Sequence, residues 1–273
     1  MSLFFKNLRT TIDGQDYYAE SVDLSESISI ETFSALGTKG SYAFPSNKPE
    51  GSMSMTFYLT TGTEISIIEN QYGKTGFVDL QVGPFETSHG LLNSFSVQAD
   101  ANNIIKGSVS YNYYGQISSG SSVSKGNAEI TPAHGAASTS NATEVGASGV
   151  LSFDYSFSQS HEVQYGLGNN NPSKVIFNEA TKELTVNALA SDIDFNQTSL
   201  TGVDALCDGE PGEAGFTKKN ISVSLNNLCQ ENVSSLSVSG YISERSINAE
   251  PGGEVVETVK VIEKFVRNAN CDE

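Results

Sequence analysis

The run Asp192-Ile-Asp194-Phe-Asn196 is the part of this chain that comes closest to metal chemistry. It has the opening spacing of a calcium loop, in which oxygens at the first, third and fifth positions coordinate the ion. The same loop needs a glycine at its sixth position for a sharp turn and a bidentate glutamate at its twelfth. Gln197 and Val203 occupy those two positions, so calcium binding is not expected.

Catalytic patterns are equally incomplete. His89, His134 and His161 are isolated from one another and from the cysteines, so they do not predict a shared metal site. Gly166-Leu-Gly168 begins like a phosphate-binding loop but lacks the third glycine and the following helix, which favours a tight turn. No Gly-x-Ser-x-Gly elbow is followed by an aspartate and a histidine in hydrolase order. We therefore predict that the protein is not an enzyme and that it uses no cofactor.

The charge balance is strongly acidic. The 273 residues include 32 Asp and Glu against 15 Lys and Arg, which gives a net charge of −17. Affinity for nucleic acid rests largely on Lys and Arg that displace counterions from phosphates. The composition therefore argues against a broad phosphate-binding surface. It is compatible with a channel wall that repels nucleic acid and lets it pass.

The chain has no run of about 18 apolar residues, so no membrane-spanning helix is predicted. Its three cysteines, Cys207, Cys229 and Cys271, are odd in number and confined to the second half. They indicate free thiols in a reducing compartment more than a disulfide framework, with one Cys207–Cys229 bridge as the alternative.

Alternation of apolar and polar residues predicts strands through most of the chain. It runs in two blocks over residues 22–31 and returns in Phe77-Val-Asp-Leu-Gln-Val. The second half has Ile221-Ser-Val-Ser-Leu and Leu236-Ser-Val-Ser-Gly-Tyr, and a closing strand is expected between residues 254 and 266. Serine and threonine at the polar positions are typical of a sheet with one face in water.

One helix is predicted, over residues 63–73. Thr63 supplies an N-cap hydroxyl, Ile65 and Ile68 lie three residues apart, and Gly73 ends the pattern. The corresponding part of the second half, residues 191–216, is polar and rich in glycine, so a loop or a single turn is expected there. The fold class is therefore all-β with one short helix.

One sequence pattern occurs in both halves of the chain. Ser27-Ile-Ser-Ile-Glu-Thr-Phe-Ser-Ala-Leu36-Gly37 aligns with Ser158-Gln-Ser-His-Glu-Val-Gln-Tyr-Gly-Leu167-Gly168. At the same distance beyond each Leu-Gly an alternating strand begins, Met53–Phe57 in the first half and Leu184–Ala188 in the second. We interpret this as duplication of one β-rich unit, which predicts two tandem, similar β-sandwich or half-barrel domains with two smaller cores.

The predicted organisation has five parts. A segment rich in serine, glycine and alanine separates the two units, and it is either a flexible linker or an extended arm that becomes ordered along a neighbouring subunit. The parts are an N-terminal arm (1–11), a first β domain (12–116), the linker or arm (117–148), a second β domain (149–266) and a C-terminal tail (267–273).

This layout resembles the tail tube proteins of bacteriophages. The shared features are a Ser- and Ile-rich strand pair, a Leu-Gly turn, a loop, an alternating strand that leads into a short helix, and a closing hairpin. The resemblance covers Val22 to Tyr114 and, less well, Leu151 to Phe265. It implies a virion structural protein, assembled in the host cytoplasm, whose trimeric, pseudo-hexameric rings stack into a tube. Its partners would be copies of itself and other tail proteins, and DNA would pass without specific binding.

The resemblance also suggests which residues act. The loops over residues 38–51 and 169–180 carry apolar side chains that pack either on their own domain or on a partner. Similarity to tail tubes favours contacts with the adjacent ring for Tyr42, Phe44, Val175, Ile176 and Phe177. Four acidic residues are expected in strands that line the channel: Asp23, Glu26, Glu31 and Glu162. For any single one of them, an ordinary solvated charge is the alternative interpretation.

Two other functions are compatible with the same pattern. One is a tail hub or adaptor present in few copies per particle, which differs from a tube protein in copy number. The other is a secreted carbohydrate-binding β-sandwich. Sugar-binding surfaces favour tryptophan, and the chain has none, although it has 11 tyrosines. Dose-dependent binding on a glycan array would favour the carbohydrate-binding function.

Overall fold

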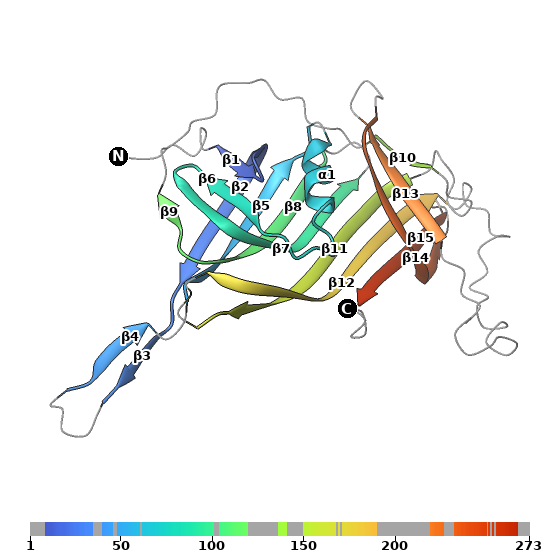
Figure 1. Ribbon diagram of the computed structural model, residues 1–273. Helices are drawn as coiled ribbons and strands as arrows, with labels where there is room; N and C mark the ends of the chain where they lie inside the picture. Colours follow the sequence, from blue (N-terminus) through green and yellow to red (C-terminus); the bar gives the residue numbers. More distant parts are fainter. Residues whose placement is uncertain are drawn as a thin grey trace, which may run out of the picture.

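The structure is an all-β fold, with one α-helix in the part of the chain that it describes (Figure 1). It is a computed structural model. It describes residues 9–34, 40–45, 48–60, 62–100, 104–119, 136–140, 150–167, 169, 171–189, 219–226, 232–249, 251, 253 and 255–266.

The first half forms a closed six-stranded barrel. Its strands follow the order β7-β6-β1-β2-β5-β8, and pairing of β8 with β7 closes it. A second, two-stranded sheet, β3-β4, continues the β2–β5 hairpin outward. The elements are β1 (Thr10–Ile12), β2 (Gln15–Ser27), β3 (Ile30–Phe33), β4 (Tyr42–Pro45), β5 (Glu50–Tyr58), α1 (Thr63–Glu69), β6 (Val78–Val82), β7 (Phe85–Asp100), β8 (Lys106–Tyr114) and β9 (Ser118–Ser119).

The second half extends the barrel sheet sideways. β11 pairs with β7, and the order continues β11-β12-β15-β14-β13-β10, so that one sheet of 13 strands runs through both halves. The strands are β10 (Ala136–Ser140), β11 (Val150–Tyr165), β12 (Pro172–Leu189), β13 (Lys219–Asn226), β14 (Asn232–Ala249) and β15 (Val255–Val266). Figure 1 shows β13, β14 and β15 at the end of the molecule opposite the β3–β4 hairpin.

The barrel interior is filled by large apolar side chains and by α1. Ile65 and Ile68 of the helix are buried, and the hydroxyl of Tyr17 donates to the carbonyl of Glu64 over 3.0 Å. Tyr17 also packs edge-on against Phe57, with ring centroids 5.0 Å apart. The predicted helix is confirmed over Thr63–Glu69, because its apolar face covers the barrel interior. Its predicted extension to Gly73 and the N-cap hydroxyl of Thr63 are wrong, since the helix ends at Glu69 and Gly62 is its N-cap, with no side-chain hydrogen bond.

The junction of β7 and β11 joins the two halves through their apolar faces. Phe95 of β7 packs against Tyr155 and Phe157 of β11, with centroids 6.2 and 5.4 Å away. Gln159 is buried beside them, accepts from the N–H of Gly73 and donates to the carbonyl of Leu92. The buried residues therefore form one continuous hydrophobic cluster, in place of the two separate cores expected from the sequence.

The strand order of the barrel recurs in the second half. The sequence of pairings β1-β6-β7-β8-β5-β2 is matched in order by β10-β13-β14-β15-β12-β11, and all of these pairs are antiparallel. One difference is closure. Among the described strands no ladder joins β10 to β11, whereas β1 and β2 are paired.

Two β-bulges mark the correspondence at single residues. The β2–β5 pairing shifts between Ala19 and Ser21, and the β11–β12 pairing shifts between Val150 and Ser152, at the same offset that relates Ser27 to Ser158. The second bulge lies between Leu92 and Ser94 in the β7–β8 pairing, and its equivalent in the β14–β15 pairing lies between Ile242 and Glu244. A bulge changes which residues face each other, so bulges at equivalent positions indicate equal registers.

The strands agree with some of the local predictions and differ from others. The closing strand expected over 254–266 is confirmed as β15. The predicted loop 169–180 is wrong from Pro172 onward, where β12 begins. The segment 117–148 contains β9, which pairs with β7, and β10, which pairs with β13. The calcium-like run, the glycine-rich 191–216 segment and all three cysteines lie outside the described residues.

Candidate assembly surfaces

The polar face of the large sheet is a groove lined mainly by hydroxyl groups. Its side chains alternate with the buried ones along adjacent strands, because successive residues of a strand point to opposite faces. The groove encloses about 520 Å³, reaches from β2 across β5, β8, β7 and β11 to β12, and so crosses the junction between the halves. Its serines are Ser21, Ser54, Ser94, Ser96, Ser108, Ser110, Ser156 and Ser158.

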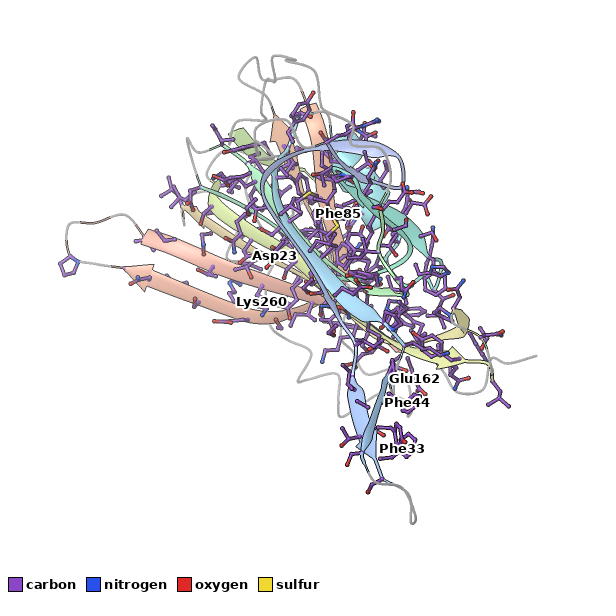
Figure 2. All side chains as sticks on the ribbon, turned by 90° about the vertical axis from the view of Figure 1, so that its left-hand side faces the viewer. Asp23, Phe33, Phe44, Phe85, Glu162 and Lys260 are labelled. Atoms are coloured by element: carbon purple, nitrogen blue, oxygen red, sulfur yellow. The ribbon has the colours of Figure 1, made fainter. Side chains whose placement is uncertain are left out.

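The charged groups of this face are mostly acidic and partly paired. Asp23 and Glu183 line the groove. Glu183 accepts from Lys260 at 2.9 Å, and this hydrogen bond raises the pKa of the Lys260 ammonium. Across the junction, the amide of Gln98 donates to Asp154 at 2.9 Å. Figure 2 labels Asp23 on β2 and Lys260 on β15.

The four acidic residues expected along a channel do not share one surface. Asp23 lines the groove. Glu162 is exposed on β11 and, four residues beyond Ser158, belongs to the same face of that strand. Glu26 belongs to the opposite face of β2, where it accepts from the N–H of Ile117 over 3.3 Å. Glu31 lies on the β3–β4 hairpin, beyond the groove. The separation of Glu26 follows from strand alternation, which places it on the face of Leu24.

The β3–β4 hairpin projects from the body of the molecule (Figure 1). It carries an exposed aromatic cluster, of which Phe33 and Phe44 are labelled in Figure 2. Phe33 packs against Tyr42 and Phe44, with ring centroids 5.7 and 5.1 Å apart. Each of the three rings keeps about half of its surface exposed: 52% for Phe33, 51% for Tyr42 and 52% for Phe44. An apolar patch held out on a two-stranded arm is typical of a surface that a partner covers.

The three residues expected in the second contact loop lie in strand β12 instead. Val175 and Ile176 are half-buried, and Phe177 is 5% exposed. Phe177 packs against His161 and Phe265, with ring centroids 5.8 and 5.5 Å apart. Phe177 therefore packs on its own subunit, because β12 pairs with β11 along this stretch and turns the ring inward.

His161 gives this packing a pH dependence. Burial lowers the pKa of the imidazole, and its hydrogen bond with the Lys74 carbonyl, 3.0 Å from Nε2, opposes that shift in part. A lowered folded-state pKa means that the neutral ring stabilises the fold fully above the unfolded-state pKa. This stabilisation is lost as the pH falls through the folded-state pKa.

We therefore expect the His161→Gln variant to lose less stability than the native chain when the pH falls. Glutamine keeps an N–H donor for the Lys74 carbonyl but has no proton to gain. Urea unfolding of both chains at about pH 7.5 and about pH 5 would measure this, because the two pH values lie on either side of the usual histidine range. Parallel losses in the two chains would contradict the expectation.

Within the described ranges, no group of His, Cys, Asp and Glu could hold a metal ion. No helix in the same ranges is long and apolar enough to cross a membrane. No protein-family model matches this chain, and none of the curated proteins matches it significantly.

Two features of these surfaces were not singled out in the sequence. Phe33 completes the hairpin cluster, and its signal is the exposed strand Ile30-Glu-Thr-Phe33 opposite Tyr42-Ala-Phe44. The other is the outer edge of β14, where Ile247 is 53% exposed beside polar neighbours. An alternating strand that leaves a large aliphatic residue exposed indicates an uncovered edge.

Proposed function

We propose that this protein is a structural subunit that assembles with copies of itself into rings, and that the rings stack into a tube of the phage-tail type. The observation that carries the proposal is the repetition of strand order and bulge positions in the two halves, joined side by side through β7 and β11. A unit that already pairs with its own repeat has the geometry to pair again with the next copy.

In this proposal the chain holds two tandem, similar β domains, near residues 12–116 and 149–266. The pairing of β10 with β13 supports an earlier start for the second domain, because β10 takes the place that β1 has in the first. Three chains would supply six such domains to one ring. The inner wall would be the continuous polar face, and the free sheet edges would be covered by neighbours.

The groove supports a channel wall better than a binding site. Most of the residues that line it are serine or threonine, and its acidic residues are Asp23 and Glu183. Hydroxyl groups carry no positive charge that would hold a phosphate, and carboxylates repel phosphates. A chain of net charge −17 repeated around a ring would add to that repulsion. We therefore propose that DNA passes through the tube without specific binding, in the tail of a virion.

Cryo-EM of particles assembled from the purified chain tests this function. We expect rings with a lumen lined by the polar face, with Asp23 and Glu183 pointing into it and the β3–β4 hairpins reaching the adjacent ring. A lumen lined by other residues, or assemblies with no lumen, would count against a DNA conduit. A chain that stays monomeric at high concentration would count against the whole proposal.

A further inference from the structure

We propose that the edge of β14 over residues 244–249 pairs antiparallel with the edge of β2, residues 22–27, of a second copy of this chain. The proposal rests on the proposed function and deepens it, because it names the strands that join one subunit to the next. The template for this contact is the internal junction of β7 and β11.

Both strands have an edge that no described strand covers. β5 pairs with β2 from Tyr18 to Ser27, whereas on the other side of β2 the strand β1 reaches only from Gln15 to Tyr17. β13 pairs with one side of β14 only up to Gly240, and β15 pairs with the other side from Tyr241 to Ala249. The side on which β13 lies is therefore uncovered by described strands beyond Gly240. An edge of this kind presents main-chain N–H and C=O groups to another chain.

The equivalent bulges fix the register of the contact. In the junction, Ser158 of β11 lies opposite Ser94 of β7. When the bulges of β2 and β11 are aligned, Ser27 is the equivalent of Ser158. When the bulges of β7 and β14 are aligned, Glu244 is the equivalent of Ser94. Ser27 is therefore placed opposite Glu244. The other pairs that follow are Glu26 with Arg245, Ser25 with Ser246, Leu24 with Ile247, Asp23 with Asn248 and Val22 with Ala249.

The polar pairs repeat the chemistry of the internal junction. Within the chain, an amide, Gln98, donates to an aspartate, Asp154. At the equivalent positions of the proposed contact, Asn248 and Asp23 are again an amide and an aspartate. Ser96 of β7 and Ser156 of β11 also face each other in the junction. The equivalent pair of the proposed contact, Ser25 and Ser246, consists of two serines as well. Both pairs lie on the polar face, which would continue unbroken from one chain to the next.

The pairs on the opposite face are also complementary. Leu24 would meet Ile247, which is 53% exposed in the single chain. Glu26 would lie opposite Arg245, whose Nε also donates to Glu257 within the chain, and cross-strand pairs of opposite charge stabilise a sheet. A slip of one residue would place Leu24 opposite a serine or an asparagine, so that apolar and polar side chains face each other. The register from the internal junction is therefore the one that matches both faces.

Disulfide trapping tests this register. Directly opposite residues in an antiparallel sheet have Cα atoms about 4.5–5.5 Å apart, within the range of a disulfide. Two single-cysteine chains, Ser25→Cys and Ser246→Cys, would be mixed, assembled and oxidised. In both, the three native cysteines are replaced by serine, and folding is checked by circular dichroism. The matched control mixes Ser25→Cys with Asn248→Cys, which lies on the same face two residues away.

We expect a covalent dimer from the first mixture, on the order of tenfold more abundant than from the control, because diagonal neighbours lie beyond normal disulfide geometry. Equal yields from the two mixtures, or a dimer from Ser25→Cys alone, would overturn the register. If tubes form and no dimer appears, this pairing is wrong and the proposed function stands. If neither tubes nor dimers form, both proposals fail.

Discussion

Replacing Arg245 with methionine is expected to lower the free energy of unfolding of the single chain by about 3–5 kcal/mol. The guanidinium of Arg245 donates from Nε to Glu257, whose side chain is completely buried, while that of Arg245 is 12% exposed. Removing the arginine would leave a buried carboxylate without its cation, which is the costly way to break a buried ion pair. Urea unfolding of the unassembled subunit would measure the change.

The double variant Arg245→Met with Glu257→Met is the matched control. It removes both charges and keeps apolar side chains of similar length, so we expect it to recover most of the lost stability. The exposed pair of Lys106 and Glu20, 2.8 Å apart, gives a second comparison. Lys106→Met should change the stability little, because water screens that pair. If Arg245→Met were as mild as Lys106→Met, the buried pair would have no structural role.

Serine at both Phe33 and Phe44 is expected to stop tube growth while the subunit remains folded. The two rings pack on each other on the β3–β4 hairpin, and half of each is exposed, so the subunit itself loses little buried surface. If both are interface hot spots worth about 2 kcal/mol each, the concentration needed for tubes rises roughly a thousandfold. Sedimentation and negative-stain microscopy would measure tube formation, and circular dichroism would measure folding.

Phe85→Ser is the matched control for this hairpin variant. Phe85 is 44% exposed on β7, away from the hairpin (Figure 2). Its replacement should leave tube formation unchanged. Phe177 is unsuitable for the same purpose, because it is buried and its loss would weaken the subunit itself. Normal tube growth by the double hairpin variant would exclude the aromatic cluster from the stacking contact.

Local patterns in the sequence predicted many of the elements. Alternation identified strands such as β5, where Met53, Met55 and Phe57 point into the barrel and serines point out. The helix was predictable because Ile65 and Ile68 lie on one face of a short segment that ends before Gly73. Signals of this kind depend only on neighbours in the chain.

What could not be predicted depends on contacts between distant residues. Residues 172–177 look like a loop because proline, serine and lysine open the segment, but the pairing of β12 with β11 makes it a strand. Tertiary pairing overrides weak β-propensity in such cases. The pairing of β7 with β11 left no local trace either, because the residues that it joins lie far apart in the chain. The orientation of Glu26 could have been predicted from strand alternation. Glu26 is two residues from Leu24, so both side chains point to the same face of β2.

Because β7 and β11 belong to one chain and pair within one sheet, the proposed ring could start to form faster than a ring of separate units. In a ring of six separate units, every joint except the last must form by collision between free molecules, and the last joint closes the ring. In this chain, one joint of each pair has formed when the chain has folded, at an effective concentration set by the chain itself. Two encounters would then bring the three chains of the proposed ring together, instead of the five needed for six separate units. Nucleation would depend on a lower power of subunit concentration, and rings would appear at dilutions where single units stay apart.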